Sequence, residues 1–315
     1  MTMNHLSKTA KIYIAGHNGM VGSACWRLLE NDGYQNLIGK TSKELDLRNQ
    51  SAVNGFIKEV KPDIIIDAAA KVGGILANST YPYEFLLDNL QIQNNLIDSA
   101  FRNNISKFIF LGSSCIYPKM ASQPLKEEFL LSSSLESTNQ WYAIAKIAGV
   151  KLIESLRLEH QKDFVSLMPT NLYGPNDNYH LTNSHVIPAL IRKFHEAKTK
   201  KMSFVKVWGS GIPLREFLHV DDLASAVLFS LENRLSDSLY NVGSGEEISI
   251  KALAELIKDI TEFEGEIKWD QSKPDGTLRK LLDSSKLNKL GWQTSIYLKA
   301  GIESTYQTFL DIQNK

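Results

Sequence analysis

Three glycines near the start of the chain constrain its fold most strongly. Gly16, Gly19 and Gly22 lie between a short apolar run, residues 11–15, and a helical pattern, residues 23–30. Because glycine has no side chain, such a strand–turn–helix unit lets the backbone turn sharply and approach a pyrophosphate at the helix N-terminus. The unit predicts a dinucleotide-binding turn, with a glycine-rich turn that binds nothing as the alternative. Its spacing, GxxGxxG, differs from the more common GxGxxG.

Strand and helix patterns alternate through the first half of the chain. Strands are expected at residues 11–15, 36–39, 63–70, 107–114 and 164–169, and helices at residues 23–30, 49–60, 82–103 and 141–160. The strands are continuously apolar, as expected when helices cover both faces of a parallel sheet. The predicted fold class is therefore α/β, with a doubly wound, Rossmann-like parallel sheet.

The alternation loosens after Thr170. Residues 171–184 are polar and rich in turn residues, and they precede expected helices at 185–198, 249–261 and 295–310 and an expected strand at 205–208. We expect residues 1–170 to form a dinucleotide-binding domain and residues 171–315 to form mainly a smaller α+β substrate-binding lobe, interleaved with the first domain. Such a lobe would cover the carboxyl ends of the strands, where ligands of open α/β sheets bind. Asp221 and Asp222 are expected to cap the helix that follows them.

The charge balance narrows the possible partners. The 315 residues include 35 Lys and Arg and 35 Asp and Glu, so the formal net charge is zero. A neutral chain has no long-range field to attract nucleic acid or an anionic membrane, and we expect neither as a partner. The two cysteines, Cys25 and Cys115, and the absence of an apolar signal core favour a reducing, cytoplasmic location. We predict no metal site.

The residues at the end of the second expected strand favour NADP(H) over NAD. An acid usually stands there and binds the ribose hydroxyls of NAD. This chain instead has Lys40, Ser42 and Lys43 at that place. Because cations and hydroxyls suit a 2′-phosphate, NADP(H) is the expected cofactor.

A tyrosine and a lysine four residues apart predict a carbonyl-reducing site. Tyr142 and Lys146 share one face of an expected helix, where the ammonium would lower the pKa of the phenol that donates a proton to a carbonyl. Ser113 ends a strand about thirty residues earlier, where its hydroxyl can polarise the same oxygen. Together with the glycine turn, these residues resemble the extended short-chain dehydrogenase/reductase family. A lone YxxxK pair would more often be a solvated helix face.

Two further residues carry possible acid–base chemistry. Cys115 directly follows the serines at the strand end, where a thiolate could remove a proton from a carbon next to a ketone. His185 begins an expected helix of the second lobe and would approach the same substrate from another side. Taken alone, Cys115 would be a small buried side chain and His185 a capping or surface residue. Inversion at a carbon needs one group on each face, which this pair would supply.

Five motifs make the resemblance more specific. They are Gly-Ser-Ser-Cys-Ile-Tyr-Pro-Lys (112–119), Tyr-Ala-Ile-Ala-Lys-Ile-Ala-Gly (142–149), Met-Pro-Thr-Asn-Leu-Tyr-Gly-Pro (168–175), Asn-Ser-His-Val-Ile-Pro-Ala-Leu (183–190) and Arg-Glu-Phe-Leu-His-Val-Asp-Asp (215–222). The motifs resemble the GDP-L-fucose synthase family, and the resemblance covers nearly the whole chain. It implies a bifunctional 3,5-epimerase and 4-reductase that acts on GDP-4-keto-6-deoxy-D-mannose with NADPH.

The resemblance also implies roles for individual residues. Ser113, Tyr142 and Lys146 would serve ketone reduction, while Cys115 would be the base and His185 the acid of epimerisation. The GDP part of the substrate would be bound by Lys193, Trp208, Arg215 and Asp275. Besides Lys40 and Ser42, the expected cofactor contacts are Gly16, Asn18, Gly19, Met20, Val21, Gly22, Leu111, Gly112, Ser113, Tyr142, Lys146, Pro169, Asn171, Leu172 and His185. A homodimer through the helices expected at 82–103 and 141–160 is also implied.

One departure from the family pattern affects the cofactor. Relatives have arginine in the glycine turn where this chain has Asn18, so the 2′-phosphate would depend on Lys40, Ser42 or Lys43, and mixed use of NAD and NADP stays open. Three other functions also stay open: a GDP-L-colitose synthase that acts on GDP-4-keto-3,6-dideoxymannose, a redox-inactive epimerase or dehydratase, and a non-catalytic dinucleotide-sensing protein of the same fold.

Overall fold

A computed structural model describes residues 6–180, 184–273 and 275–313 of the chain. Asn183, which belongs to one of the motifs above, Pro274 and the first five residues lie outside the described ranges. None of the helices within these ranges is long and apolar enough to cross a membrane.

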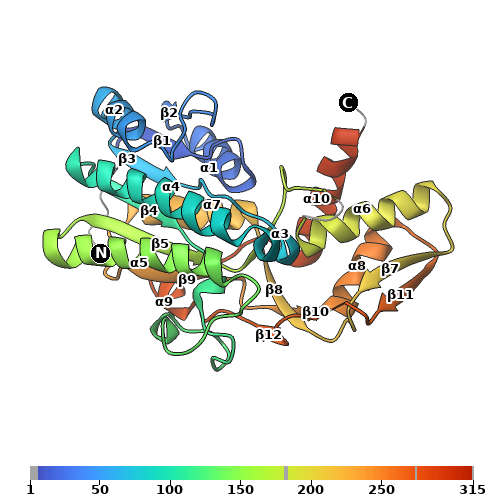
Figure 1. The fold of residues 1–315 in the computed structure, drawn as a ribbon. Helices are drawn as coiled ribbons and strands as arrows, with labels where there is room; N and C mark the ends of the chain where they lie inside the picture. The colour runs from blue at the N-terminus through green and yellow to red at the C-terminus, as the bar shows by residue number, and fades with distance from the viewer. Residues whose placement is uncertain (1–5, 181–183, 274, 314–315) are drawn as a thin grey trace.

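A six-stranded sheet forms the centre of the larger lobe (Figure 1). Its order is β2-β1-β3-β4-β5-β9, and every neighbouring pair is parallel. The strands are β1 (Lys11–Ala15), β2 (Asn36–Ile38), β3 (Ile64–Asp67), β4 (Lys107–Leu111), β5 (Asp163–Pro169) and β9 (Leu239–Val242). The predicted α/β fold with a doubly wound parallel sheet is confirmed.

Helices cover both faces of this sheet. The helices are α1 (Met20–Asn31) and α7 (Val220–Glu232) on one face, and α2 (Gln50–Val60), α4 (Pro82–Arg102) and α5 (Gln140–His160) on the other. Successive side chains of a strand point to opposite faces, so Ile12 and Ile14 of β1 enter one core while Tyr13 and Ala15 enter the other. This arrangement explains why the strands are apolar throughout.

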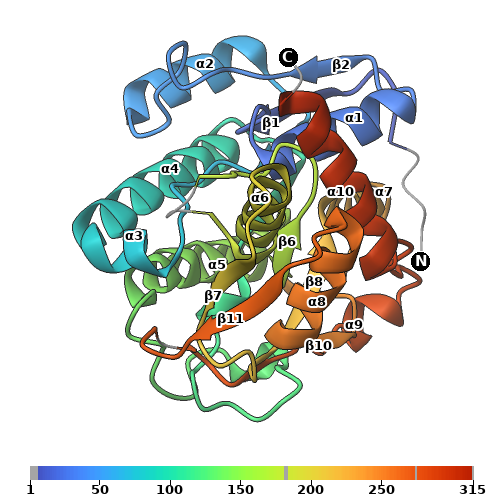
Figure 2. The ribbon, with the colours of Figure 1, turned by 90° about the vertical axis from the view of Figure 1, so that its right-hand side faces the viewer.

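The smaller lobe is built around two short sheets and a third core (Figure 2). Its elements are β6 (Asn171–Tyr173), α6 (Val186–Thr199), β7 (Phe204–Trp208), β8 (Leu214–His219), β10 (Glu247–Ser249), α8 (Ile250–Thr261), β11 (Glu266–Asp270), β12 (Arg279–Lys280) and α10 (Leu298–Gln313). Strand β8 pairs with β10, β12 and β6, and β7 pairs with β11. The short helices α3 (Ile75–Thr80), η1 (Ser114–Ile116), η2 (Glu127–Phe129) and α9 (Ser285–Asn288) complete the structure.

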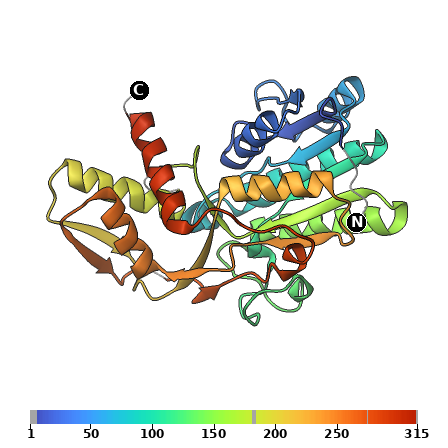
Figure 3. The ribbon, with the colours of Figure 1, turned by 180° about the vertical axis from the view of Figure 1, so that it is seen from behind.

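Two segments of the second half of the chain return to the larger lobe. Helix α7 packs against α1 and lies over the sheet in the view from behind (Figure 3). Strand β9 extends the sheet beside β5. The chain therefore crosses between the lobes several times, and the sheet is completed by residues that follow the first strands of the smaller lobe.

The expected capping role of Asp221 and Asp222 is wrong. The N-cap of α7 is His219, whose Nδ1 accepts a hydrogen bond of 3.3 Å from the backbone N–H of Asp221. The Asp221 carboxylate instead accepts a bond of 2.8 Å from Arg27 on α1. The buried Asp222 carboxylate accepts bonds of 2.9–3.1 Å from Ser295 and the N–H of Ile296. Both acids thus make tertiary contacts.

Gly22 provides a test of the glycine turn. A Cβ atom at Gly22 would lie 2.2 Å from the carbonyl oxygen of Gly16, whereas one at Gly55, in the exposed face of α2, would meet nothing within 4 Å. We expect Gly22→Ala to destabilise the protein by about 1–3 kcal/mol, because backbone must move. The matched change Gly55→Ala should stabilise it by roughly 0.5–1 kcal/mol. Urea unfolding measures both; equal effects of the two changes would contradict the packing role of Gly22.

Candidate active site

A cavity of about 1210 Å³ runs from the glycine turn, past the carboxyl ends of the strands, to the smaller lobe. Most of the predicted site residues line it: Gly16, Gly19, Met20, Val21, Lys40, Ser42, Leu111, Gly112, Ser113, Cys115, Tyr142, Lys146, Pro169, Asn171, Leu172, His185, Arg215 and Asp275. Asn18, Gly22, Lys43, Lys193 and Trp208 are not among its lining residues. The fold thus brings five separate motifs to one cavity.

The glycine end of this cavity fits a dinucleotide pyrophosphate. Gly19 is the N-cap of α1 and makes no side-chain capping bond, so the N–H groups of the first turn are available to an anion. Gly16 has a φ of +76°, and a Cβ there would lie 2.9 Å from the carbonyl oxygen of Ala68. Any larger residue at Gly16 would strain the turn and push it from β3, which explains the glycine. Gly22 does not line the cavity and serves the packing of α1 on the turn.

The loop after β2 is held by an acid that lies outside the predicted set. Glu44 accepts hydrogen bonds of 2.8 Å from both the backbone N–H and the hydroxyl of Thr41, and one of 3.4 Å from Lys40. These bonds, led by the one from the Thr41 backbone, lower the pKa of Glu44 to about 2. Lys40 and Ser42 line the cavity at this loop, whereas Asn18 is exposed. The carboxylate therefore fixes the loop that presents the cations.

The expected reductive residues come from β4 and α5. Lys146 is 2 % exposed, and its Nζ donates a hydrogen bond of 2.9 Å to the carbonyl oxygen of Leu111 at the end of β4. The same Nζ lies 5.8 Å from the centre of the Tyr142 ring. Ser113 follows β4 directly, and its Oγ accepts a bond of 3.4 Å from the N–H of Cys115. The hydrogen bond of Lys146 thus ties α5 to the strand end that carries Ser113.

The pKa of Tyr142 departs from the sequence-based expectation. Burial raises it well above the ordinary value, and the negative charges of Cys115 and Asp67 add to the rise. Burial also lowers the pKa of Lys146, which Asp67 opposes. The expected lowering of the phenol pKa by the ammonium is therefore wrong for this structure, because desolvation dominates. The phenol is protonated at neutral pH, as a proton donor must be.

Asp67 is a buried acid beneath this site that the sequence analysis missed. It ends β3, is fully buried, and accepts a hydrogen bond of 3.2 Å from the N–H of Ala69. Burial raises its pKa to about 6, and the ammonium of Lys146 opposes the rise. Asp67 and Lys146 are thus both buried and each influences the pKa of the other, while Asp67 also raises the pKa of Tyr142.

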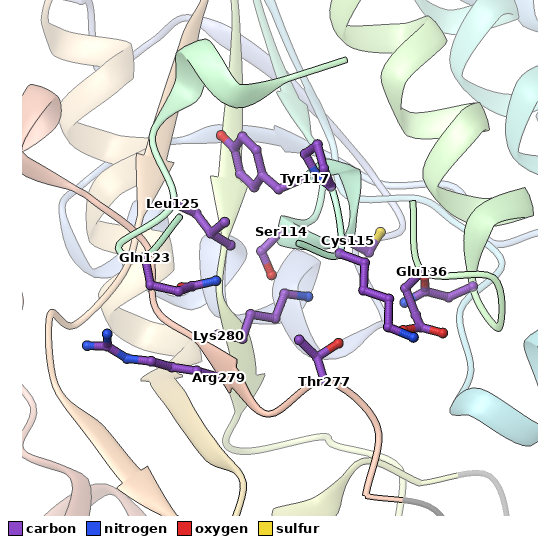
Figure 4. A pocket seen from close by; sticks show the side chains of 12 residues that line it. Ser114, Cys115, Tyr117, Gln123, Leu125, Glu136, Thr277, Arg279 and Lys280 are labelled. Carbon is purple, nitrogen blue, oxygen red and sulfur yellow. The ribbon is translucent and has the colours of Figure 1, made fainter. Parts of the chain in front are cut away.

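Cys115 lies in η1 beside the serine hydroxyls and is 8 % exposed. Burial raises the pKa of its thiol, and Lys280 is the strongest opposing influence. Figure 4 shows the Lys280 side chain extending from β12 toward Ser114 and Cys115 across a small cavity. The sequence analysis missed Lys280, whose approach depends on the pairing of β12 with β8, where it lies opposite Arg215.

His185 reaches the cavity from the other lobe. It is the N-cap of α6, its side chain is 49 % exposed, and it makes no capping hydrogen bond to the helix. Its Nδ1 lies 3.8 Å from the Oδ1 of Asp177. Cys115 and His185 therefore line one cavity from different lobes, as the predicted pair requires.

The residues expected to bind the nucleotide divide into two pairs: Arg215 and Asp275 line the cavity, whereas Lys193 and Trp208 are not among its lining residues. The Nζ of Lys193 is 5.3 Å from the centre of the Trp208 ring, and the pKa of Lys193 is lowered by burial. The Asp275 carboxylate accepts two bonds of 2.7 Å from the N–H and hydroxyl of Ser210. Arg215 donates a bond of 3.3 Å to the Asp275 carbonyl oxygen. Asp275 thus holds the turn after Trp208, while Arg215 faces the cavity.

The reactivity of Cys115 tests these electrostatics. Because only the thiolate reacts and burial raises the pKa of Cys115, we expect slow alkylation by iodoacetamide at pH 7 that accelerates as pH rises. Lys280→Met removes the opposing cation and should slow alkylation about threefold to tenfold at a given pH. A Cys115→Ser protein is the control, because burial raises the pKa of the remaining thiol, Cys25, to about 12. Fast labelling at pH 7 that Lys280→Met leaves unchanged would contradict this account.

Comparisons with known proteins agree with the geometry. Residues 12–243 match the model of the NAD dependent epimerase/dehydratase family. A protein of Arabidopsis thaliana named putative GDP-L-fucose synthase 2 is 57% identical over 97% of this chain and 93% of its own length. The GDP-L-fucose synthase of Escherichia coli is 50% identical over 97% of this chain and 98% of its own. A GDP-L-colitose synthase of Yersinia pseudotuberculosis is 39% identical over 96% of this chain and 99% of its own.

A solved structure shares the fold over the full length. The GDP-mannoheptose C4 reductase from Campylobacter jejuni, solved with NADP bound, is 38% identical and superposes with a TM-score of 0.90. The match covers 97% of this chain and 99% of the reductase.

Proposed function

The chain belongs to the NAD dependent epimerase/dehydratase family and, within it, to the GDP-L-fucose synthases, and on this premise we propose how its residues make GDP-L-fucose. It converts GDP-4-keto-6-deoxy-D-mannose by epimerisation at C3 and C5 and by hydride transfer to C4. The observation that carries the proposal is the common cavity of Ser113, Cys115, Tyr142, Lys146 and His185. The groups for reduction and the groups for acid–base chemistry therefore act on one bound sugar.

The cofactor is NADP(H), which supplies the hydride when bound. The N–H groups in the first turn of α1 would hold its pyrophosphate, and Gly16 would allow the close approach. Lys40 and Ser42 provide a cation and a hydroxyl for the 2′-phosphate at the loop that Glu44 holds. Without an arginine at Asn18, binding of the 2′-phosphate depends on this loop.

Epimerisation uses the acidity that the C4 ketone gives to its neighbouring C–H bonds. The hydroxyls of Ser113 and Tyr142 donate hydrogen bonds to the ketone oxygen and stabilise the enolate that forms when a proton leaves C3 or C5. Cys115 removes that proton as the thiolate, and His185 returns one to the opposite face of the carbon. Cys115 releases its proton to solvent before each abstraction, and His185 takes up a proton from solvent after each transfer. The same pair serves both carbons, because both flank one ketone.

Reduction ends the sequence at the same ketone. Tyr142, which burial keeps protonated, donates its proton to the C4 oxygen as hydride arrives at C4. Lys146 lies behind the ring and stabilises the phenolate that remains. Once the ketone is an alcohol, the C3 and C5 hydrogens are no longer acidic. Epimerisation must therefore precede reduction.

The part of the cavity that Arg215 and Asp275 line, together with the nearby turn after Trp208, takes the GDP part of the substrate. Lys193 and Arg215 supply cations for the diphosphate oxygens, and the half-exposed Trp208 offers a face for the guanine ring. Asp275 acts there by holding Ser210 and thus the turn beside Trp208. These contacts place the hexose between the two lobes.

The other functions are less well supported. The GDP-L-colitose synthase is less similar to this chain than the fucose synthases of Arabidopsis thaliana and Escherichia coli named above, and it would act at C5 without inversion at C3. A dinucleotide sensor or a redox-inactive enzyme would not need Ser113, Tyr142 and Lys146 together in a reductive arrangement. The fucose product therefore remains the proposal.

A homodimer in the cytoplasm completes the proposal. The outer faces of α4 and α5 carry exposed apolar side chains, including Trp141, Ile144 and Leu158 of α5, and Tyr83 of α4 is 73% exposed. These two helices pack against each other, and we place the dimer surface on their exposed sides. The unpaired thiols of Cys25 and Cys115 suit a reducing compartment.

Product analysis of Cys115→Ser tests the division of labour. The variant should still oxidise NADPH with the ketosugar, because Ser113, Tyr142 and Lys146 are unchanged. Its product should be a deoxysugar that has not been epimerised, with fucose formation reduced by about 100-fold or more. Chromatography of the GDP-sugars, with wild-type enzyme and Tyr142→Phe as controls, makes the measurement. Normal formation of fucose by Cys115→Ser would show that another group is the base.

The dimer surface can be tested with charged substitutions. We expect Tyr83→Glu combined with Ile144→Glu to convert the dimer to a monomer in sedimentation experiments, because two buried charges oppose association. Met120→Glu, at an exposed apolar residue outside α4 and α5, is the matched control and should leave the dimer intact. A monomeric wild type, or a dimer that resists the double substitution, would contradict the proposed interface.

A further inference from the structure

Asp177 is a buried acid in the loop between β6 and α6 that no role above explains. Its side chain is 3% exposed. Its Oδ1 accepts a hydrogen bond of 2.7 Å from the N–H of Asn178, while its Oδ2 has no hydrogen-bond partner in the part of the chain that the structure describes. A buried carboxylate oxygen without a partner is costly, and such groups are often retained for a function.

Hydrogen bonds to both lobes hold the loop that carries Asp177. The N–H of Asp177 donates a bond of 3.3 Å to the carbonyl oxygen of Gly174. Asn176 donates a bond of 3.0 Å to the Oγ of Ser23 in α1. Arg192 of α6 donates a bond of 2.8 Å to the carbonyl oxygen of Tyr179. The position of Asp177 is therefore fixed relative to both the glycine turn and the helix that His185 begins.

His185 is the neighbour toward which this carboxylate is directed. The distance from its Nδ1 to the Oδ1 of Asp177 is 3.8 Å, and the ring also lines the large cavity. A neutral imidazole carries its proton on one nitrogen only, and an acceptor near Nδ1 favours the proton there. The ring makes no capping bond to α6, so the helix does not compete for Nδ1.

We propose that Asp177 is the positioning residue for His185: its carboxylate, 3.8 Å from Nδ1 in this structure, accepts the Nδ1–H when substrate is bound, fixes the ring orientation and directs Nε2 toward the substrate carbon. This inference rests on the proposed function, in which His185 returns the proton during epimerisation. When protonated, the ring holds one proton on Nδ1 toward Asp177 and transfers the other from Nε2 to carbon. The carboxylate orients the ring, as an acid does behind a catalytic histidine.

Burial of the Asp177 carboxylate suits it to orient His185. Removal from water strengthens the interaction of the carboxylate with the ring, while the exposed half of His185 remains open to the cavity. A carboxylate that only shaped the loop would need just the bond from the N–H of Asn178. The oxygen that approaches Nδ1 is Oδ1, the same atom that accepts the bond from Asn178, and this approach to 3.8 Å distinguishes the two roles.

Nitrogen NMR of the histidine rings tests the inference directly. In protein labelled with ¹⁵N-histidine, the His185 signals are assigned by their loss in His185→Gln. We expect the wild-type ring to be protonated on Nδ1 when neutral, and Asp177→Asn to abolish that preference. Asp177→Asn should also slow the incorporation of solvent deuterium at C3 and C5 by about tenfold or more, with NADPH oxidation retained. Asn178→Ala, which removes a neighbouring loop contact to the N–H of His180 but leaves the carboxylate, should change neither readout.

The outcomes separate this inference from the proposed function. A wild-type His185 protonated on Nε2 would overturn the role of Asp177, whether or not the Asp177→Asn variant folds. So would an Asp177→Asn variant with unchanged tautomer and unchanged deuterium incorporation. If His185→Gln itself retains full incorporation, the proposed acid is wrong, and the NMR result still decides whether Asp177 orients the ring.

Discussion

Burial of ionisable groups at the carboxyl edge of the sheet is the constraint on which the site depends. Lys146, Cys115 and Asp67 are buried and Tyr142 is half-buried at the cavity, so the charged form of each is disfavoured unless a neighbour compensates. The bond from Lys146 to the carbonyl oxygen of Leu111 fixes the cation, and Asp67 lies close enough to oppose its loss of charge. A protonated phenol and a thiol at rest follow from the same desolvation.

The smaller lobe contributes chemistry as well as a binding surface. The buried Glu216 carboxylate accepts bonds of 2.8 Å from the N–H of Gly245 and 3.0 Å from the N–H of Leu282. These bonds hold the segment after β12 and hence Lys280 opposite Cys115 (Figure 4). The same lobe brings His185 to the cavity. Because the chain crosses several times between the lobes, the positions of Cys115 and His185 relative to each other are fixed.

Sequence patterns predicted the strands, helices and turns that depend on neighbouring residues, but not the contacts between distant segments of the chain. The apolar runs identified the parallel sheet, and the glycine spacing identified the turn before α1. Both signals come from residues that are adjacent in the sequence. Lys280, Asp67 and Asp177 escaped notice, since their neighbours come from elsewhere in the chain. The direction of the Tyr142 pKa shift was wrong for the same reason: spacing along a helix reveals the nearby ammonium but not the depth of burial. Asp221 and Asp222 looked like caps, yet their partners lie on α1 and after α9.

The central claim is that one ketone-binding site performs two inversions and then one reduction. Incubation of GDP-4-keto-6-deoxy-D-mannose with the enzyme and NADPH in deuterated water, followed by NMR of the product, tests it most directly. We predict GDP-L-fucose with solvent deuterium at both C3 and C5, and one NADPH oxidised for each product molecule. Deuterium at C5 alone, or turnover without NADPH oxidation, would contradict the account.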